Sequence, residues 1–344
     1  MTGLLVSLAT MALIAAQLPV IDNQRDDRYI VMREFVSPIT GDVFYAPVLR
    51  KEQPVISWDY DRCPHPPINT LAYTLVIDPT TGYTAPPDEF NNPVGWDAAD
   101  IERILGQPHF SRSAPESLPW AGAFAWEKLE NAALLAAASE DPEYIIANWW
   151  LMAAWSVRLD VISGENEFDD EVERLFSILP SVPYDAGDIN TLYEIQIARQ
   201  WEKKNDTGGV KDVKDSELAL ALAWLYRSRG ELSAASIWLR TASLHDPELA
   251  ETSVLYQYLE SSISLEKQYL ITTRLWLKRA WDKRGLPPHM EGGTAFILGE
   301  LNRRLGEVQS AVVWYNMALE KNMGMISNGL IEHQRDLCVN SHGY

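Results

Sequence analysis

The pattern of apolar and polar positions divides the chain into two regions. From about residue 21 to residue 113, short apolar runs alternate with Pro, Asp and Thr, and two runs, residues 42–49 and 71–77, have the length and alternation of β-strands. From about residue 116 onward, Ala, Leu and Trp recur at helical spacing and prolines fall between the periodic segments. This predicts an α+β fold that is mainly α, with a β-rich N-terminal region followed by helices.

The periodic segments predict a series of helical hairpins. The expected helices cover residues 120–138, 142–159, 168–179, 187–204, 214–229, 231–245, 251–262, 264–284, 293–305 and 307–321. Successive hairpins of this kind are typical of repeat proteins and indicate internal repeats in the sequence.

Two stretches, residues 216–247 and 294–322, carry small and large residues at corresponding positions. Small residues let two helix backbones approach closely, and a glycine between the helices permits a tight turn. These spacings match a tetratricopeptide repeat, and an ordinary helical bundle is the alternative. The positions are Leu222, Ala223, Tyr226, Gly230, Ala235, Leu239, Ala242 and Pro247 in the first stretch, and Leu298, Gly299, Gly306, Ala311, Tyr315 and Ala318 in the second.

The length of 344 residues suits two domains, each able to bury a substantial core. We expect residues 1–18 to be an apolar signal or anchor segment and residues 19–115 to form a β-rich, ribbon-like domain. Residues 116–322 are expected to form a tetratricopeptide-like helical domain, and residues 323–344 a C-terminal tail.

Charge and cysteine content exclude two classes of protein. The net charge of −19 argues against nucleic-acid binding, because phosphate contacts need clustered Lys and Arg. Two cysteines, Cys63 and Cys338, are too few for a disulfide framework, although they permit a single bridge.

The first residues form a nearly unbroken apolar run from Gly3 to Ala16, followed by a small-residue stretch that ends at Gln17. This resembles a secretory signal, although it lacks the Lys or Arg expected near Met1. The run is shorter than the roughly 20 residues of a comfortable bilayer span. It predicts an extracytoplasmic protein of the periplasm or cell envelope; an uncleaved membrane anchor and a buried N-terminal helix are the alternatives.

Four stretches carry a resemblance to a known family. They are SPITGDVFYAPV (37–48), DYDRCP (59–64), DPTTGYTAPPDEF (78–90) and LGELNRRLGEVQSAVVWYNMAL (298–319). In this order they resemble the bacterial domain-of-unknown-function family 2225, whose members join a zinc ribbon to tetratricopeptide-like helices. The resemblance implies that architecture but no known activity. It also places Ser37, Thr40, Asp78 and Thr81 where the family has cysteines.

These replacements make a zinc site at the ribbon unfavourable, since hydroxyl groups do not ionise usefully near neutral pH. We expect no cofactor. A residual metal site would have to use Cys63, His65 and Asp78, with Asp59 and Asp61 nearby. Alternatively, the turns hold without a metal, with Ser37 and Asp78 accepting hydrogen bonds from backbone amides two or three residues further on. In that case Gly41 and Gly82 adopt positive φ angles.

The remaining candidate residues suggest binding to a partner. The sequence contains no HExxH, GxSxG, Walker-type or GxGxxG motif, so we expect no enzyme. The leading hypothesis is a non-catalytic interaction protein or accessory scaffold subunit in the cell envelope. A metal-binding sensor or enzyme and a membrane-anchored subunit of a larger complex are the alternatives. Residues 267–304 are locally basic and could receive an acidic partner, with an ordinary solvated helix surface as the alternative. Adjacent Trp149 and Trp150 cannot both face the same way, so at least one is expected at an edge or interface. The candidate partner-binding residues are Trp149, Trp150, Arg274, Lys278, Arg279, Arg303 and Arg304.

Overall fold

The computed structural model describes residues 29–55, 57–59, 61–65, 70–91, 95–106, 123–163, 169–177, 214–228 and 230–340. The expected signal or anchor segment, residues 1–18, and the expected helix at 187–204 lie outside the described residues. The described chain is mainly helical with small two-stranded sheets near its N-terminus, which confirms the predicted fold class.

Three short antiparallel hairpins form the N-terminal region. β1 (Ile30–Val36) pairs with β2 (Val43–Leu49), β3 (Ser57–Trp58) with β4 (Pro64–His65), and β5 (Val76–Ile77) with β6 (Thr84–Ala85). Phe35 lies opposite Phe44 in the first hairpin, and both rings pack against Phe90 with centroids 5.5 and 5.6 Å away. This aromatic cluster, joined by Tyr83, gives the small region a core of its own.

Two elements of this region differ from the prediction. The first half of the expected strand at 71–77 is a 3₁₀ helix, η1 (Thr70–Tyr73), and β-pairing is confined to Val76–Ile77. A helix that the alternation did not reveal, α3 (Ala98–Leu105), follows the last hairpin. Asp97 and Asp100 form a reciprocal capping box at the start of α3. The overall composition of this region does not reveal this local signal for a helix start.

The helices begin and end close to the prolines and glycines that separate the predicted helices. They are α4 (Ala125–Ala138), α5 (Glu143–Ser163), α6 (Asp169–Ser177), α8 (Asp215–Ser228), α9 (Leu232–His245), α10 (Leu249–Thr252), α11 (Val254–Asp282), η2 (Pro288–Met290), α12 (Glu291–Arg304), α13 (Val308–Lys321) and α14 (Asn328–Asn340).

Two predictions about this region were wrong. The helices expected at 251–262 and 264–284 are one continuous helix, α11, because no Pro or Gly interrupts it and the buried residues Leu259, Ile263 and Leu270 keep helical spacing across the expected break. The expected C-terminal tail contains α14, which packs on α13 and buries Ile331 and Cys338.

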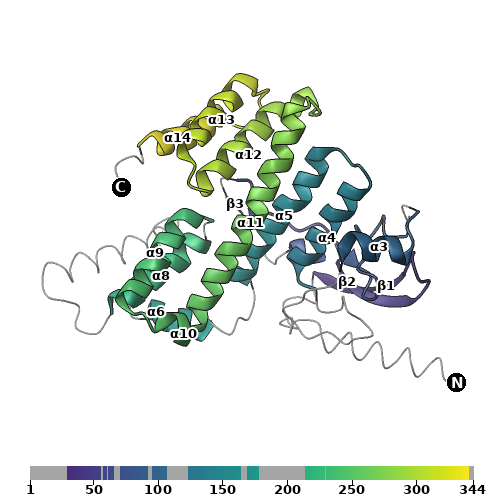
Figure 1. Ribbon diagram of the computed structural model, residues 1–344, viewed down its shortest axis with the longest axis horizontal. Coiled ribbons are helices and arrows are strands. Elements are labelled where there is room, and N and C mark those ends of the chain that lie inside the picture. Colours follow the sequence, from purple (N-terminus) through teal and green to yellow (C-terminus); the bar gives the residue numbers. More distant parts are fainter. Residues whose placement is uncertain are drawn as a thin grey trace, which may run out of the picture.

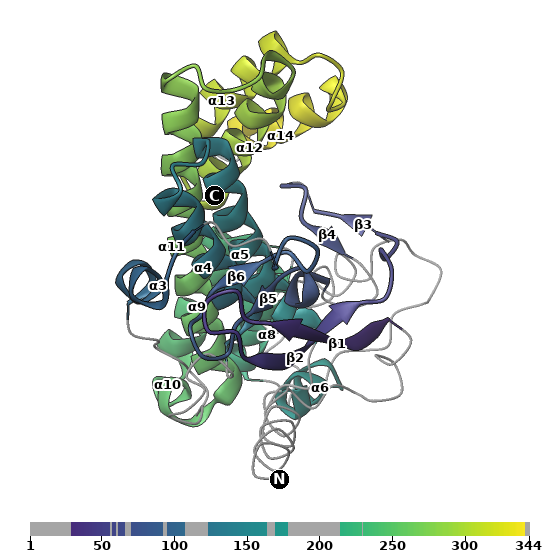
Figure 2. The same ribbon diagram turned by 90° about the vertical axis from the view of Figure 1, so that its right-hand side faces the viewer.

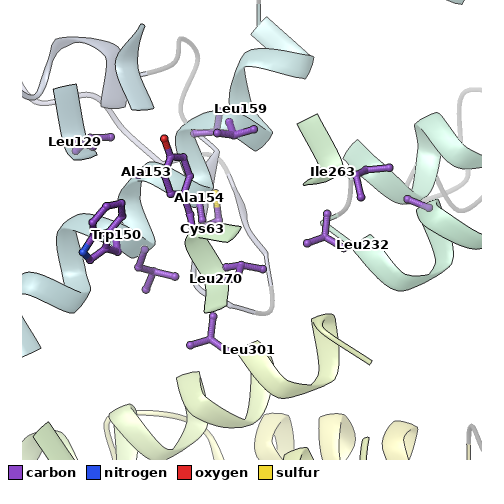
Figure 3. Packing of buried hydrophobic residues seen from close by; sticks show 14 of the residues in the cluster. Cys63, Leu129, Trp150, Ala153, Ala154, Leu159, Leu232, Ile263, Leu270 and Leu301 are labelled. Carbon is purple, nitrogen blue, oxygen red and sulfur yellow. The ribbon is translucent and has the colours of Figure 1, made fainter. Parts of the chain in front are cut away.

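The long helix α11 is the centre of the arrangement. α5 lies beside it, α8 and α9 lie near its N-terminal end, and α12 to α14 lie at its C-terminal end (Figure 1). Figure 2 shows the strands gathered on one side of α11. Side chains from α4, α5, α9, α11 and α12 share one apolar core, and Cys63 reaches into it from the strand region (Figure 3). The two regions are therefore packed together.

The turn glycines and one small-to-large contact expected of the two repeated hairpins are present. Gly230 and Gly306 have φ angles of 71° and 82°, in the left-handed region that favours glycine. A Cβ atom added to Gly299 would lie 2.6 Å from Cε1 of Tyr315, so this glycine allows the tyrosine of α13 to pack against α12. Within the described ranges, no helix is both long and apolar enough to cross a bilayer.

Candidate functional site

The turns that begin at Ser37 and Asp78 use the same hydrogen bonds. Oγ of Ser37 accepts from the amides of Ile39 and Thr40, at 3.2 and 3.0 Å. Oδ1 of Asp78 accepts from the amides of Thr80 and Thr81, at 2.8 and 3.2 Å. Each side chain therefore accepts bonds from amides two and three residues further on, as predicted for turns that hold without a metal.

The backbones of the two turns also correspond. The amide of Gly41 donates to the carbonyl of Ser37 at 3.0 Å, and that of Gly82 donates to the carbonyl of Asp78 at 2.9 Å. Both glycines have φ of 79°, which confirms the predicted positive angles. The turns are thus two copies of one local structure, despite their different sequences.

A side-chain hydrogen bond joins the two turns directly. The hydroxyl of Ser37 donates to Oδ2 of Asp78, and both side chains are buried. In a zinc ribbon the metal holds two such turns together. Here the buried serine and aspartate make that connection through one charge-assisted hydrogen bond, a type stronger than a neutral one.

Cys63 and Asp78, two of the residues proposed for a residual metal site, have different surroundings. Cys63 packs in the helical core, whereas Asp78 lies beside the aromatic cluster of the strand region. His65 pairs through its backbone with Ser57. Among the described residues, no three His, Cys, Asp or Glu side chains are placed to hold a metal ion.

A second polar centre, which we call the buried charge network, lies between the strand region and the helices. Its hub is Arg158 on α5, which is fully buried. Nη1 of Arg158 is 2.6 Å from a carboxylate oxygen of Asp59, and Nη2 is 2.8 Å from Asp61 and 2.6 Å from Glu266 on α11. One guanidinium group therefore connects the β3–β4 hairpin to two helices.

Two further buried arginines complete this centre. Arg227 on α8 is 2.5 Å from the second oxygen of Glu266, and its Nε donates to Ser262 at 3.2 Å. Arg304 on α12 is 3.2 Å from Asp61. Asp61 and Glu266 each lie between two guanidinium groups, so the network links α5, α8, α11 and α12.

The network extends toward the C-terminal hairpin through Glu300. The hydroxyl of Tyr315 on α13 donates to Oε1 of Glu300 at 2.6 Å, and Arg303 lies 3.0 Å from Oε2. Arg303 also lies 2.6 Å from Glu231, in the turn between α8 and α9. The two repeated hairpins are therefore connected by charged side chains as well as by apolar packing.

Burial and charge act in opposite directions on Asp61. Burial alone raises the pKa of its carboxyl group, but Arg158 and Arg304 outweigh burial and hold that pKa below its ordinary value of 3.8. The indole Nε1 of Trp155 donates a further hydrogen bond to Asp61 at 3.2 Å. The carboxylate is therefore ionised at neutral pH, as the buried Arg158 and Arg304 require, since an unpaired buried charge is costly.

Some of the predicted partner-binding residues are buried, whereas Lys278 and Arg279 are exposed. Arg304 is fully buried and Arg303 nearly so, because both belong to the buried charge network. The expectation that Arg303 and Arg304 lie on a contact surface is therefore wrong. Arg274 pairs with Glu307 at 2.8 Å, and the remaining two cations, Lys278 and Arg279, lie against Asp282 at 3.1 Å and over the ring of Trp276 at 4.8 Å.

The two adjacent tryptophans face different environments, as predicted. Trp150 is buried and packs against Tyr269, with ring centroids 5.7 Å apart. Trp149 is only partly buried and lines an open pocket of about 170 Å³ between β6 and α4. Of the pair, Trp149 is the one that a partner can reach.

Sequence reasoning missed the buried charge network. The Asp-rich segment 59–64 was interpreted through its resemblance to a family motif and as part of a residual metal site, and Arg303 and Arg304 were interpreted as surface residues. A usable signal was present: Arg158 and Arg227 follow long apolar stretches, and an arginine on an otherwise apolar helix face needs a carboxylate partner when it is buried. The partners themselves were not identifiable from spacing.

Comparison with protein-family models yields no match, and comparisons with curated proteins and with solved structures yield none either.

Proposed function

We propose that this protein is a non-catalytic interaction scaffold that presents the outer surface of its helical hairpins to another protein. The observation that carries the proposal is a set of large apolar side chains exposed on these hairpins. Ile237 and Leu244 are 61% and 74% exposed and lie two turns apart on one face of α9. Large apolar side chains exposed on one helix face are available to a partner protein. Val313, Met323 and Met325 are similarly exposed in the C-terminal hairpin.

The interior supports this proposal in a different way. The buried charge network connects the strand region with four helices through ion pairs between buried side chains. Removing one partner of a buried ion pair is strongly destabilising, because the other charge is left unpaired. The network therefore favours a single placement of the strand region relative to the four helices. A contact surface built on elements held in this way is pre-organised for binding.

We further propose that the hairpins α8–α9 and α12–α13 are tetratricopeptide-like units of a short solenoid. The small-to-large packing of Gly299 with Tyr315 and the positive φ angles of the two turn glycines favour this assignment. An accessory role in a membrane-associated complex of the cell envelope fits both the helical surface and the apolar run at residues 3–16.

Co-purification from native cells tests the proposal. A tagged full-length chain is isolated, and the mass of the eluted species is measured by analytical ultracentrifugation. We expect a complex larger than the 38.8 kDa chain. The double variant Ile237→Ser with Leu244→Ser should lose that complex while keeping its helical circular dichroism.

A matched control removes apolar surface elsewhere. Val36 and Val43 face each other across the β1–β2 hairpin and are 46% and 56% exposed. The double variant Val36→Ser with Val43→Ser should keep the complex. A strictly monomeric wild-type protein, or equal loss from both double variants, would count against the proposal.

A further inference from the structure

The open pocket beside Trp149 has a defined chemical character. It lies at the junction of β6, the start of α3 and the α4–α5 hairpin, with a volume of about 170 Å³. Trp96 and Trp149 contribute aromatic surface and are both partly buried. Glu89 and Asp141 contribute two exposed carboxylates. Aromatic faces combined with carboxylates are typical of sites that bind organic cations.

These carboxylates are not used inside the protein. Within the described part of the chain, neither Glu89 nor Asp141 forms an ion pair. Glu89 lies close enough to Tyr83 that, after burial, it is the second cause of the raised pKa of that tyrosine. The pocket therefore combines unneutralised negative charge with aromatic rings.

A second open depression on the surface is lined by charges of both signs. Its charged lining residues are Asp282, Arg284, Glu291 and Lys321, and Lys321 lies 3.9 Å from Glu291. Opposite charges in one site neutralise each other and favour no particular ligand charge. The pocket beside Trp149 is thus the better defined binding site of the two.

We propose that the pocket beside Trp149 receives a lysine side chain of the partner protein. The inference rests on the proposed function and specifies the chemistry of the partner. The volume of the cavity equals that of about five or six molecules of liquid water. This size suits one long side chain rather than a helix. The ammonium group lies near Glu89 and Asp141, and the alkyl stem packs between the rings of Trp96 and Trp149. The net charge of −19 favours approach of a basic partner.

The experiment uses the full-length protein and a short capped peptide with one central lysine flanked by glycines. Indole N–H resonances are followed by NMR during titration, with those of Trp96 and Trp149 assigned from Trp96→Leu and Trp149→Leu variants. We expect these two resonances to shift, with a Kd on the order of 1 mM. The same peptide with an acetylated lysine, or with norleucine in its place, should shift neither resonance.

Paired charge variants provide the matched control. Glu89→Gln with Asp141→Asn should weaken peptide binding about threefold to tenfold, and Trp149→Leu about twofold to fivefold. Asp88→Asn with Glu140→Gln changes two carboxylates at neighbouring positions outside the pocket and should leave the affinity unchanged. Equal weakening by both pairs would show general electrostatic attraction and overturn the proposal.

Other occupants are also outcomes of this experiment. Equal binding of the norleucine or acetylated peptide would reassign the pocket to a neutral side chain, and tenfold tighter binding of tetramethylammonium would reassign it to a small quaternary amine. Either result overturns the lysine assignment. If the peptide fails to bind but the native complex still forms, the pocket assignment alone falls. If the peptide binds and no complex exists, the scaffold function falls.

Discussion

Nη1 of Arg304 donates a hydrogen bond to the carbonyl oxygen of Gly230, 74 positions earlier in the chain. A Cβ atom added to Gly230 would lie 1.8 Å from that nitrogen and 2.6 Å from Cζ of Arg158. The glycine that permits the α8–α9 turn is thus also the surface against which two buried guanidinium groups lie. Its small size is required by the buried charge network as well as by the turn.

We therefore expect Gly230→Ala to be strongly destabilising. The left-handed φ of 71° costs about 1–2 kcal/mol for any residue with a Cβ atom. Displacement of Arg304 and Arg158 from their carboxylates adds to this, so we expect a total loss of at least about 3 kcal/mol in the free energy of unfolding. Urea denaturation measures the loss.

Gly306 offers a matched control at the corresponding turn between α12 and α13. Its φ is 82°, but a Cβ atom there would meet nothing closer than Oγ of Ser233 at 3.6 Å. Gly306→Ala should therefore show the conformational cost alone, about 1–2 kcal/mol. Equal losses at the two glycines would mean that contact with the arginines contributes nothing.

Asp61 should make stability depend on acid pH. Because the folded-state pKa of its carboxyl group is below the ordinary 3.8, the ionised form stabilises the fold at neutral pH. That contribution is present above about pH 5 and is lost as the pH falls through 4 toward the lower folded-state pKa. Urea unfolding at pH 7, 5, 4 and 3 should show the decline.

Asp61→Asn removes this titration. We expect it to cost about 3–5 kcal/mol at pH 7, because Arg158 and Arg304 lose a charged partner, and to flatten the decline between pH 5 and 3. Asp88→Asn, at an exposed ion pair with Arg33, should cost less than about 1 kcal/mol. An unchanged acid dependence in Asp61→Asn would assign that dependence to other carboxyl groups.

The two corresponding turns should accept a metal when thiols are introduced. Ser37 and Asp78 already contact each other, and both turns have the same amide hydrogen bonds and positive-φ glycines. The variant Ser37→Cys, Thr40→Cys, Asp78→Cys, Thr81→Cys should bind one zinc ion per chain, measured by metal analysis and by cobalt–thiolate absorption.

A two-cysteine variant, Ser37→Cys with Thr40→Cys, controls for adventitious binding. It supplies half of a tetrahedral thiolate site and should bind zinc far more weakly. If the four-cysteine variant folds but binds no zinc, the two turns do not have ribbon-knuckle geometry.

Both cysteines should be unreactive while the protein is folded. Burial raises the pKa of the Cys63 thiol well above its ordinary value, and burial raises that of Cys338 to about 11. At pH 8 only about one Cys338 thiol in a thousand is then ionised, and the thiolate is the reactive form. Iodoacetamide followed by mass measurement should add two groups in urea and none without it. A mass two units lower, with no alkylation in urea, would instead show a disulfide.

Local features were readable from the sequence where neighbouring residues decide the outcome. The turn glycines Gly41, Gly82, Gly230 and Gly306 were predicted because a tight turn needs a positive φ, which glycine adopts at low cost. The helix α11 was wrongly divided and α3 was missed, since both depend on how weak local signals combine with packing. Of the pocket beside Trp149, the sequence analysis predicted only Trp149 itself, as a candidate partner-binding residue.

The sequence by itself determined the fold class, the approximate helix limits and the hydrogen bonding within the two turns, because these depend on spacing and on hydrogen bonds between residues two to four positions apart. Tertiary structure alone decided where the charges lie. Asp61 meets Arg158 across 97 positions of the chain, and nothing in local periodicity records such a pairing. Arg304, which looked like part of a surface patch, also lies beside Asp61 in the interior link between the strand region and the helices, because a charge removed from water must find its partner within the fold.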